Sequence, residues 1–300
     1  MFLAIDIGGT DIKYAIINDK LDIIEQQQLP TAKHNLKQMI TEQIDHIVTT
    51  FLISAVNVKG IGISTAGVVD SETGEIVYAG PTMPSYIGTN LKHWIETHYH
   101  VPVVVMNDVN AAALGEKWLG AAKGFRNFLC MTLGTGIGGA LVINDELYIG
   151  THFKAGEIGH IPFQIHEKMS YEQKASMSAL MNRAKLELNF IGTGKQLFDE
   201  AKNGNLAINQ LIDDWTKDIA IGLVPILCTL DCEAVVIGGA VSRQGSYLIN
   251  KIADQLQHVK TASLTTPQII AASLGNDAAL YGVIYAFQNT TLSSKLDTKG

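Results

Sequence analysis

The sequence predicts an α/β protein in which two lobes begin in the same way. Each lobe starts with two short apolar runs joined by a glycine-rich turn, first across residues 2–17 and again across residues 128–143. Elsewhere, apolar runs of strand length alternate with segments in which apolar residues recur every three or four positions, as in amphipathic helices. This alternation is typical of α/β folds, and the two turns predict an antiparallel hairpin at the start of each lobe.

The composition describes a well-packed globular protein. Its 300 residues are 47% hydrophobic and 17% charged, and this length can bury a large core and allows two domains. The net charge of −7 argues against nucleic acid as the main partner, because phosphate backbones attract basic surfaces. Three cysteines offer no disulfide framework, and no signal peptide or membrane-spanning run is apparent. We therefore expect a cytoplasmic protein that binds neither nucleic acid nor membrane.

The first lobe is expected to continue from its hairpin with alternating helices and strands. Apolar residues recur every three or four positions across 36–54, which predicts a helix with one apolar face. The run at 101–106 is apolar throughout, as in a strand covered on both faces. The remaining expected elements are strands at 21–28 and 58–64, an irregular stretch at 65–88, and helices at 91–99 and 111–119.

The second lobe is expected to follow its hairpin with helices and two further strands. The expected helices cover 171–188, 194–202, 209–227, 247–257 and 278–287, and the strands cover 234–239 and 269–273. The last helix is expected to return to the first lobe. The smaller N-terminal lobe would then comprise residues 1–110 plus 275–300, and the larger C-terminal lobe residues 111–274.

Both hairpin turns are candidate phosphate-binding sites, because glycine lets the backbone adopt positive φ, approach a ligand and point its amides at phosphate oxygens. Two such turns suggest two lobes that grip one polyphosphate. The second, Gly134-x-Gly136-x-x-Gly139, also matches the dinucleotide-binding fingerprint. That fingerprint needs a helix after the turn, whereas residues 140–143 are typical of a strand. Neither turn carries the Walker signature, so a P-loop is also disfavoured.

Three side chains beside the first turn could act on phosphate. Asp6 ends an apolar strand beside Gly8 and Gly9, where it could cap the amides of the turn or hold Mg²⁺ through water. We favour the magnesium role. Thr10 could donate its hydroxyl to phosphate. Lys13 is either an exposed side chain or a counter-charge for phosphate, and the spacing does not choose between them.

Asp108 is the candidate general base. The pair Asn107-Asp108 follows a buried strand and precedes a helix, so an ordinary N-cap is the simple alternative. The pair Asn276-Asp277 joins a strand to a helix in the same way, and spacing alone does not distinguish the two pairs. A carboxylate that faces a cleft between lobes could accept the proton of a sugar hydroxyl as that hydroxyl attacks phosphorus.

Glu157 and His160 stand three residues apart and could bind vicinal hydroxyls from one face, although a lone histidine is more often structural or exposed. A zinc site at His160 is disfavoured, because no cysteine occurs between Met131 and Leu227 and no third ligand stands at a convincing spacing. We therefore expect no structural zinc.

With these residues assembled, the sequence resembles the ROK family of bacterial sugar kinases, within the actin/hexokinase/Hsp70-like superfamily. The resemblance runs from Ile5 to about Phe287. It rests on Asp6-Ile-Gly-Gly-Thr10, Asn107-Asp-Val-Asn-Ala-Ala-Ala113, Leu133-Gly-Thr-Gly-Ile-Gly-Gly139, Gly156-Glu-Ile-Gly-His160 and Val236-Ile-Gly-Gly239. It implies two ribonuclease-H-like lobes with mixed sheets around an interlobe cleft that closes on ATP and sugar. It also implies a homodimer.

The resemblance further implies a role for each matching residue. By position, Asp108 corresponds to the catalytic base, whereas Asp277 remains an N-cap. Asn107, Glu157 and His160 correspond to sugar ligands. The residues that correspond to the family's phosphate turns and nucleoside contacts are Gly8, Gly9, Thr10, Gly134, Thr135, Gly136, Gly138, Gly238 and Gly239.

Three departures from the family pattern bear on function. The cysteine-rich zinc loop of many members is missing, so the chain resembles the zinc-free branch, and Glu172 remains as a further sugar ligand. The family's Pro-Asn-Leu-Pro-Gly-Trp loop, which borders the sugar pocket, appears as Pro-Thr-Met-Pro-Ser-Tyr at 81–86, so glucokinase specificity does not transfer. Asp11 stands where the family often has lysine, which leaves Lys13 as the nearest cation in sequence.

The sequence thus predicts an ATP- and Mg²⁺-dependent sugar 6-kinase acting on glucose, N-acetylmannosamine or a β-glucoside. The alternative is a non-catalytic ROK-type regulator that senses sugar. Such regulators carry an N-terminal helix-turn-helix, which we do not expect here because the kinase-like strand begins at residue 2. A dehydrogenase is a third class, opposed by the strand after Gly139.

Overall fold

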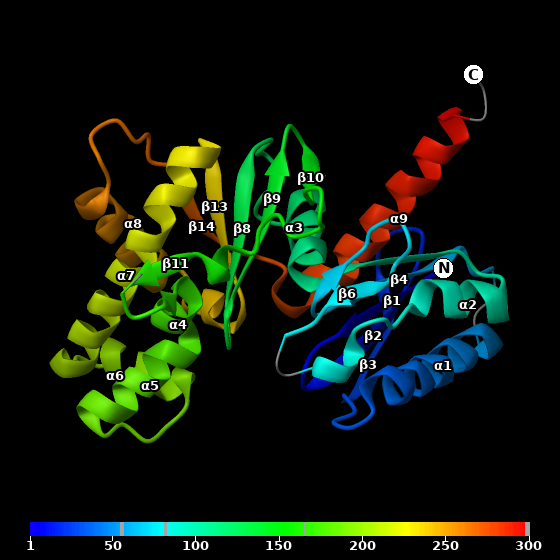
Figure 1. Cartoon of the computed structure of the whole chain (residues 1–300), viewed down its shortest axis with the longest axis horizontal. Coiled ribbons are helices and arrows are strands. Elements are labelled where there is room, and N and C mark those ends of the chain that lie inside the picture. The colour runs from blue at the N-terminus through cyan, green and yellow to red at the C-terminus, as the bar shows by residue number, and fades with distance from the viewer. Residues whose placement is uncertain (55–56, 81–82, 165, 298–300) are drawn as a thin grey trace. The chain divides into compact units, whose positions relative to one another are not determined.

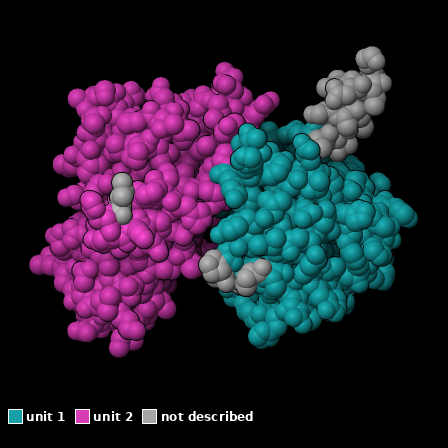
Figure 2. Space-filling model, in the orientation of Figure 1, with its two compact units in different colours: residues 1–119, 149–154, 277–300 teal, residues 120–148, 155–276 magenta. Residues whose placement is uncertain are grey.

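The chain divides into two compact units, shown in different colours in Figure 2. The computed structural model describes residues 1–54, 57–80, 83–164 and 166–297. Unit 1 comprises residues 1–119, 149–154 and 277–300, and unit 2 comprises residues 120–148 and 155–276. Unit 1 therefore extends further than the division expected from the sequence, by residues 111–119 and 149–154.

Unit 1 is built on a five-stranded mixed sheet with the strand order β3-β2-β1-β4-β7. Its strands are β1 (Phe2–Ile7), β2 (Asp11–Ile17), β3 (Ile23–Pro30), β4 (Gly60–Thr65) and β7 (Val103–Asn107). The first three pair antiparallel, as the hairpin pattern predicts, whereas β4 runs parallel to β1 and β7 runs parallel to β4. The stretch expected to be irregular contains β5 (Val68–Val69), β6 (Ile76–Tyr78) and the 3₁₀ turn η1 (Pro84–Tyr86).

Helices cover both faces of this sheet (Figure 1). One face carries α1 (Leu36–Ser54) and α2 (Leu91–Tyr99), and the other carries α3 (Asp108–Trp118) and α9 (Ala278–Asp297). Alternate side chains of β1 enter different cores, so that Ile5 packs with α1 and Ala4 packs with α9. Burial on both faces explains why β1, β4 and β7 are mainly apolar, whereas the edge strand β3 is polar and largely exposed.

Two glycines let α3 and α9 pack backbone against backbone. A Cβ atom at Gly115 of α3 would overlap the carbonyl of Ala278, and a Cβ at Gly282 of α9 would overlap the carbonyl of Ala111. This close approach joins α3 to α9 within unit 1. It is the physical reason why the division between the units follows α3 instead of preceding it.

Unit 2 repeats the sheet of unit 1. Its strand order is β10-β9-β8-β13-β14. The strands are β8 (Phe128–Leu133), β9 (Ile137–Ile143), β10 (Glu146–Tyr148), β13 (Ala234–Gly238) and β14 (Gln268–Ala271). The first three again pair antiparallel, and β13 and β14 continue the sheet in parallel. In both units a glycine turn therefore joins the central strand to its antiparallel neighbour.

The helices of unit 2 pack around a core that contains the fully buried side chain of Trp215. They are α4 (Tyr171–Ala175), α5 (Met177–Leu188), α6 (Gly194–Lys202), α7 (Leu206–Leu230) and α8 (Ser246–Val259). Shorter elements are β11 (Pro162–Gln164), β12 (Met169–Ser170), and the 3₁₀ turns η2 (Ile158–His160), η3 (Ala240–Gln244) and η4 (Gly275–Asp277). In the described part of the chain, no helix is apolar and long enough to span a membrane.

The helices differ from the sequence prediction at several places, and the largest difference is in α9, which continues to Asp297, ten residues beyond the predicted end at 287. The helix predicted over 171–188 is interrupted at Ser176, whose backbone is extended and whose hydroxyl accepts the Ala179 N–H at 3.2 Å to cap α5. Helix α7 begins three residues before the predicted start and ends three after the predicted end, passing through Pro225. Helix α3 begins at Asp108 instead of residue 111, because Asn107 caps it.

The glycine contacts between α3 and α9 generate a stability prediction. Gly282→Ala places a methyl group against a backbone carbonyl that cannot move alone, so we expect a loss of about 1–3 kcal/mol and a lower unfolding midpoint. Gly124→Ala is the matched control, since its added Cβ would meet no atom within 4 Å. Circular dichroism during heating measures both. An unchanged midpoint for Gly282→Ala would contradict the packing described here.

Candidate functional site

The first glycine turn, between β1 and β2, is bound on its carbonyl side by the segment that follows β3. Thr31 donates its hydroxyl to the Gly8 carbonyl at 2.7 Å and its N–H to the Thr10 carbonyl at 2.8 Å. Lys33 Nζ donates to the Gly9 carbonyl at 2.8 Å. Three consecutive carbonyl groups of the turn are therefore occupied, while Gly9 and Thr10 remain exposed.

Glycine is favoured at position 8 because the backbone passes close to the Asp11 carbonyl, and not because the residue has positive φ. The Gly8 N–H donates to the Asp11 carbonyl at 3.0 Å, and a Cβ at Gly8 would lie only 3.1 Å from that oxygen. Neither Gly8 nor Gly9 has positive φ, so the left-handed backbone that glycine permits is not used here. A Cβ at Gly9 would meet no atom within 4 Å, which leaves that face of the turn open.

Lys33 was missed by the sequence analysis, which named Lys13. The register of β2 with β3 pairs Asp11 with Pro30, and this pairing brings the residues after Pro30 to the turn. That register is the signal that could have identified Lys33. Lys13 instead lies opposite Asp6 in the β1–β2 pair.

Asp6 carries a half-buried carboxyl group at the end of β1. The sheet places Ser64 of β4 beside it, and the Ser64 hydroxyl donates to Asp6 Oδ1 at 2.6 Å. Burial raises the pKa of the Asp6 carboxyl, and the Ser64 hydrogen bond and the charge of Lys13 oppose that rise. A poorly solvated carboxylate beside a hydroxyl is an oxygen donor set that suits Mg²⁺, so these residues fit a magnesium ion.

Asn107 is the N-cap of α3, and its side chain also holds Asp108. Its Oδ1 accepts the N–H groups of Val109 at 2.9 Å and Asn110 at 3.0 Å. Its Nδ2 donates to the Gly67 carbonyl and to Asp108 Oδ1, each at 2.9 Å. The Val109 N–H also reaches Asp108 Oδ1 at 2.9 Å. The half-exposed carboxylate of Asp108 is thus oriented by two donors at the end of β7.

Asp277 has different surroundings from Asp108. It lies in the 3₁₀ turn before α9, and its Oδ1 accepts the Gln26 side-chain N–H at 2.9 Å. Gln26 belongs to β3, so this bond ties the start of α9 to the edge of the sheet. The two Asn-Asp pairs, which spacing alone could not distinguish, therefore differ in what holds the carboxylate.

The second glycine turn is bound by two segments of unit 2. The Gly134 N–H donates to the Gly136 carbonyl at 3.0 Å, and the Met177 N–H at the start of α5 donates to the Gly134 carbonyl at 3.0 Å. Gly239 has a φ of +84°, and a Cβ there would overlap the Leu133 carbonyl. Gly239, the residue after β13, therefore lies directly against the residue that precedes the turn.

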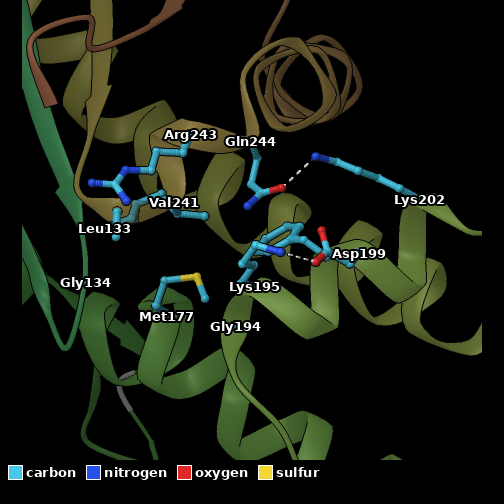
Figure 3. Close-up of a pocket in the computed structure, with 12 residues that line it drawn as sticks. Leu133, Gly134, Met177, Gly194, Lys195, Asp199, Lys202, Val241, Arg243 and Gln244 are labelled. Atoms are coloured by element: carbon cyan, nitrogen blue, oxygen red, sulfur yellow. Dashed lines mark hydrogen bonds and ion pairs between the residues drawn. The ribbon is translucent and has the colours of Figure 1, made fainter.

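A pocket of about 520 Å³ opens beside Gly134 in unit 2 (Figure 3). Its lining residues come from the turn, α5, α6 and η3, and are Leu133, Gly134, Met177, Gly194, Lys195, Phe198, Asp199, Lys202, Ala240, Val241, Arg243 and Gln244. Lys195 pairs with Asp199 at 2.7 Å, and Lys202 donates to Gln244 at 2.8 Å. Its apolar and cationic lining suits a nucleoside with attached phosphates.

Three of the four side chains predicted to bind sugar, those of Glu157, His160 and Glu172, lie together in unit 2, whereas Asn107 belongs to unit 1. His160 Nε2 is 3.5 Å from Glu157 Oε2, and His160 Nδ1 is 3.8 Å from Glu172 Oε1. All three side chains are partly exposed. We call Glu157, His160 and Glu172 the acidic triad. Two carboxylates around an imidazole can accept and donate hydrogen bonds to several hydroxyl groups at once.

Three glycines let the segment that carries Glu157 and His160 pack against β9. A Cβ at Gly139 would lie 2.5 Å from the Gly156 carbonyl, and Cβ atoms at Gly156 and Gly159 would overlap the carbonyls of Gly139 and Ile137. Gly156 also has a φ of +92°. The glycines of the Gly156-x-x-Gly159-His160 motif are therefore required by backbone contact with the strand that follows the second turn.

The predicted site residues fall into two sets. Unit 1 holds Asp6, Gly8, Gly9, Thr10, Lys13, Asn107 and Asp108, and unit 2 holds Gly134, Thr135, Gly136, Gly138, Glu157, His160, Glu172, Gly238 and Gly239. In unit 1, Asp6 and Asn107 stand at the same ends of parallel strands, because Asp6 pairs with Ser64 and the next residue, Thr65, pairs with Asn107. In unit 2, Thr135 is exposed at the tip of its turn.

The loop at 81–86 is described only in part, since Pro81 and Thr82 lie outside the described residues. Tyr86, which replaces the family's tryptophan, is fully buried, and its hydroxyl lies 3.0 Å from Thr65 Oγ1. Burial raises the pKa of Tyr86 well beyond its usual range. Tyr86 thus anchors the end of this loop to the end of β4.

Comparisons with known proteins match nearly the whole chain. The β-glucoside kinase of Listeria monocytogenes is 30% identical over 292 residues, which cover 95% of this chain and 96% of that protein. The crystal structure of a ROK family glucokinase from Streptomyces griseus, in complex with glucose and AMPPNP, superposes with a TM-score of 0.81 at 28% identity. It covers 94% of this chain and 97% of that one.

A ROK family transcriptional regulator of known structure shares the fold, with a TM-score of 0.82 at 19% identity over 96% of this chain and 77% of that one. The model of the ROK family itself matches residues 2–290. The two repeated mixed sheets agree with these matches. The chain therefore belongs to the ROK family.

Proposed function

We propose that this protein is an ATP- and Mg²⁺-dependent sugar kinase that transfers the γ-phosphate of ATP to the 6-hydroxyl of a hexose, an amino sugar or a β-glucoside. One observation in unit 2 carries the proposal. Gly134 lines the pocket, and the backbone at Gly136 contacts the carboxylate of Glu172 in the acidic triad. A nucleoside-sized pocket and a group suited to sugar hydroxyls thus flank one phosphate-binding turn. The β-glucoside kinase and glucokinase relatives support the same reaction.

Asp108 is the general base in this proposal. The sugar oxygen attacks the γ-phosphorus, a new P–O bond forms, the bond to the leaving ADP oxygen breaks, and the hydroxyl proton passes to Asp108. Asn107 Nδ2 and the Val109 N–H hold Oδ1 of the carboxylate, so its orientation is fixed before substrate binds. Such preorganisation avoids the cost of ordering the base during the reaction.

Asn107 acts mainly on Asp108 in this mechanism. Both hydrogens of its Nδ2 are used, by Gly67 and Asp108, and its Oδ1 accepts two backbone N–H groups. The family resemblance implies that Asn107 also contacts the sugar. Such a contact would have to use an amide atom that already takes part in these hydrogen bonds. The acidic triad, with partly exposed side chains, supplies the other hydroxyl contacts.

The first turn and its neighbours act on the phosphates. Asp6 would hold Mg²⁺, and the ion would neutralise charge on the phosphates. Thr10 donates its hydroxyl to phosphate, and Lys33, fixed by the Gly9 carbonyl, adds a positive charge beside the turn.

We propose that the protein acts as a homodimer in the cytoplasm. A sugar-sensing regulator is the second candidate, favoured by the fold shared with the ROK transcriptional regulator.

A panel of acceptors tests the proposed function directly. Glucose, N-acetylmannosamine and methyl β-glucoside are each incubated with ATP and Mg²⁺, and ADP release is measured. We expect at least one acceptor to give sustained turnover, with the phosphate on its 6-oxygen by NMR. Sugar binding without turnover on any acceptor would contradict the kinase proposal and favour the regulator.

The base assignment predicts that Asp108→Asn lowers kcat by about 10²–10⁴-fold, because the amide keeps the shape but cannot take the proton. The dissociation constant for AMPPNP, measured by calorimetry, should change little. Asp277→Asn is the matched control, since its carboxylate bonds only to Gln26 among the described contacts and should leave kcat nearly unchanged. Comparable losses in both variants, or retained turnover in Asp108→Asn, would overturn the assignment.

The magnesium assignment predicts that Asp6→Asn raises the Mg²⁺ concentration for half-maximal rate by roughly tenfold or more. The asparagine can still accept the Ser64 hydrogen bond, so the loss of charge is isolated. Asp19→Asn, an exposed carboxylate paired with Lys59, serves as the control. Magnesium titrations of the rate measure both variants. Identical titration curves for wild type and Asp6→Asn would exclude a role for Asp6 at the metal.

A further inference from the structure

The carboxylate of Glu172 touches the second glycine turn and also faces His160 of the acidic triad. Its Oε2 accepts the N–H of Ile137, the first residue of β9, at 3.3 Å. The same oxygen occupies the space that a Cβ at Gly136 would fill. Its Oε1 lies 3.8 Å from His160 Nδ1. One oxygen therefore contacts the backbone of the turn while the other faces a predicted sugar ligand.

The main chain after Glu172 holds the other end of the same turn. Helix α4, which carries Glu172, ends at the extended residue Ser176. The next residue, Met177, donates its N–H to the Gly134 carbonyl at 3.0 Å. The turn from Gly134 to Ile137 is thus bound at one end by a backbone bond and at the other by a side chain, both from one short segment.

The backbone that carries His160 also meets this turn. The glycines at 156 and 159 lie against β9, and a Cβ at Gly159 would overlap the carbonyl of Ile137. The N–H of Ile137 therefore donates to Glu172, and its carbonyl lies against Gly159. The first residue of β9 is thus contacted by α4 and by η2, the two elements that bear Glu172 and His160.

We infer that Glu172 is a positioning residue for the nucleotide-binding turn as well as a sugar ligand, so that the acceptor site and the donor site share one carboxylate. The inference deepens the proposed function and rests on it, because it takes the second turn to bind phosphate. A sugar hydroxyl that bonds to Glu172 acts through it on the Ile137 N–H. The side chain is 32% exposed, which leaves it within reach of a hydroxyl while it holds the turn.

Two substitutions separate the two roles. Glu172→Ala removes the acceptor for the Ile137 N–H, whereas Glu172→Gln keeps an oxygen and the side-chain shape but loses the charge. Without any sugar present, calorimetry should show Glu172→Ala raising the dissociation constant of AMPPNP about fivefold or more. Glu172→Gln should stay within about twofold of wild type. Both should raise KM for the panel acceptor with the highest turnover, because alanine removes the acceptor for the sugar hydroxyl and a neutral amide is a weaker acceptor than a carboxylate.

Gly136→Ala tests the contact from the other side. In the wild-type background its methyl group displaces the Glu172 carboxylate from the turn, so AMPPNP binding should weaken as in Glu172→Ala. In the Glu172→Ala background the space is empty, and the methyl group should add little. The double-mutant cycle is therefore expected to be strongly non-additive. Glu167→Gln, an exposed carboxylate five residues earlier, is the control and should leave all constants unchanged.

The outcomes distinguish this inference from the proposed function. AMPPNP binding unchanged in Glu172→Ala, together with a raised KM for sugar, would show a sugar ligand only and overturn the inference. An additive cycle would overturn it as well. Wild-type protein that binds no AMPPNP would instead overturn the proposed function on which the inference rests. Unfolding midpoints for every variant confirm that the folded protein is being measured, and Glu172→Gln supplies the conservative rescue.

Discussion

Both units of this protein depend on close contact between backbone segments, which glycine allows because it has no side chain. In unit 2, Gly156 and Gly159 bring the segment that carries Glu157 and His160 onto β9, within reach of the second glycine turn. In unit 1, Gly115 and Gly282 bring α9 onto α3, whose first residue is Asp108. Any side chain larger than hydrogen at these places would move functional groups by more than a hydrogen bond tolerates.

The same sheet order serves different chemistry in the two units. Each sheet joins its central strand to an antiparallel neighbour through a glycine turn and adds two parallel strands on the other side. In unit 1 the ends of the parallel strands bear Asp6 and Asn107, beside a carboxylate suited to act as base. In unit 2 the region around the turn bears a pocket and the acidic triad. The shared sheet fixes the backbone positions, and the two units differ in the few side chains placed at the ends of its strands.

The fold was largely predictable from the sequence, and the site only in part. Strands buried on both faces appear as unbroken apolar runs, so most elements could be placed from composition and periodicity. The family's motifs singled out Asp108 and the acidic triad, whose roles stay predictions. Lys33 was not identified, because its place beside Gly9 depends on the register of β3. The pocket residues Arg243 and Gln244 were also missed, since their position depends on distant segments meeting. The break at Ser176 follows from a local cap that periodicity does not detect.

The pairing of α3 with α9 has a consequence for the order of synthesis. Helix α3 precedes nearly all of unit 2 in the chain, and α9 follows it. While the ribosome makes unit 2, the glycine-lined face of α3 has no partner, and the sheet of unit 1 lacks the helix that covers one of its faces. Unit 1 can therefore complete its core only after unit 2 has been translated, although most of unit 1 is translated before unit 2. The helix that carries Asp108 is fixed in place at that late stage, so a partly made chain can form the pocket beside Gly134 before the carboxylate of Asp108 has its final position.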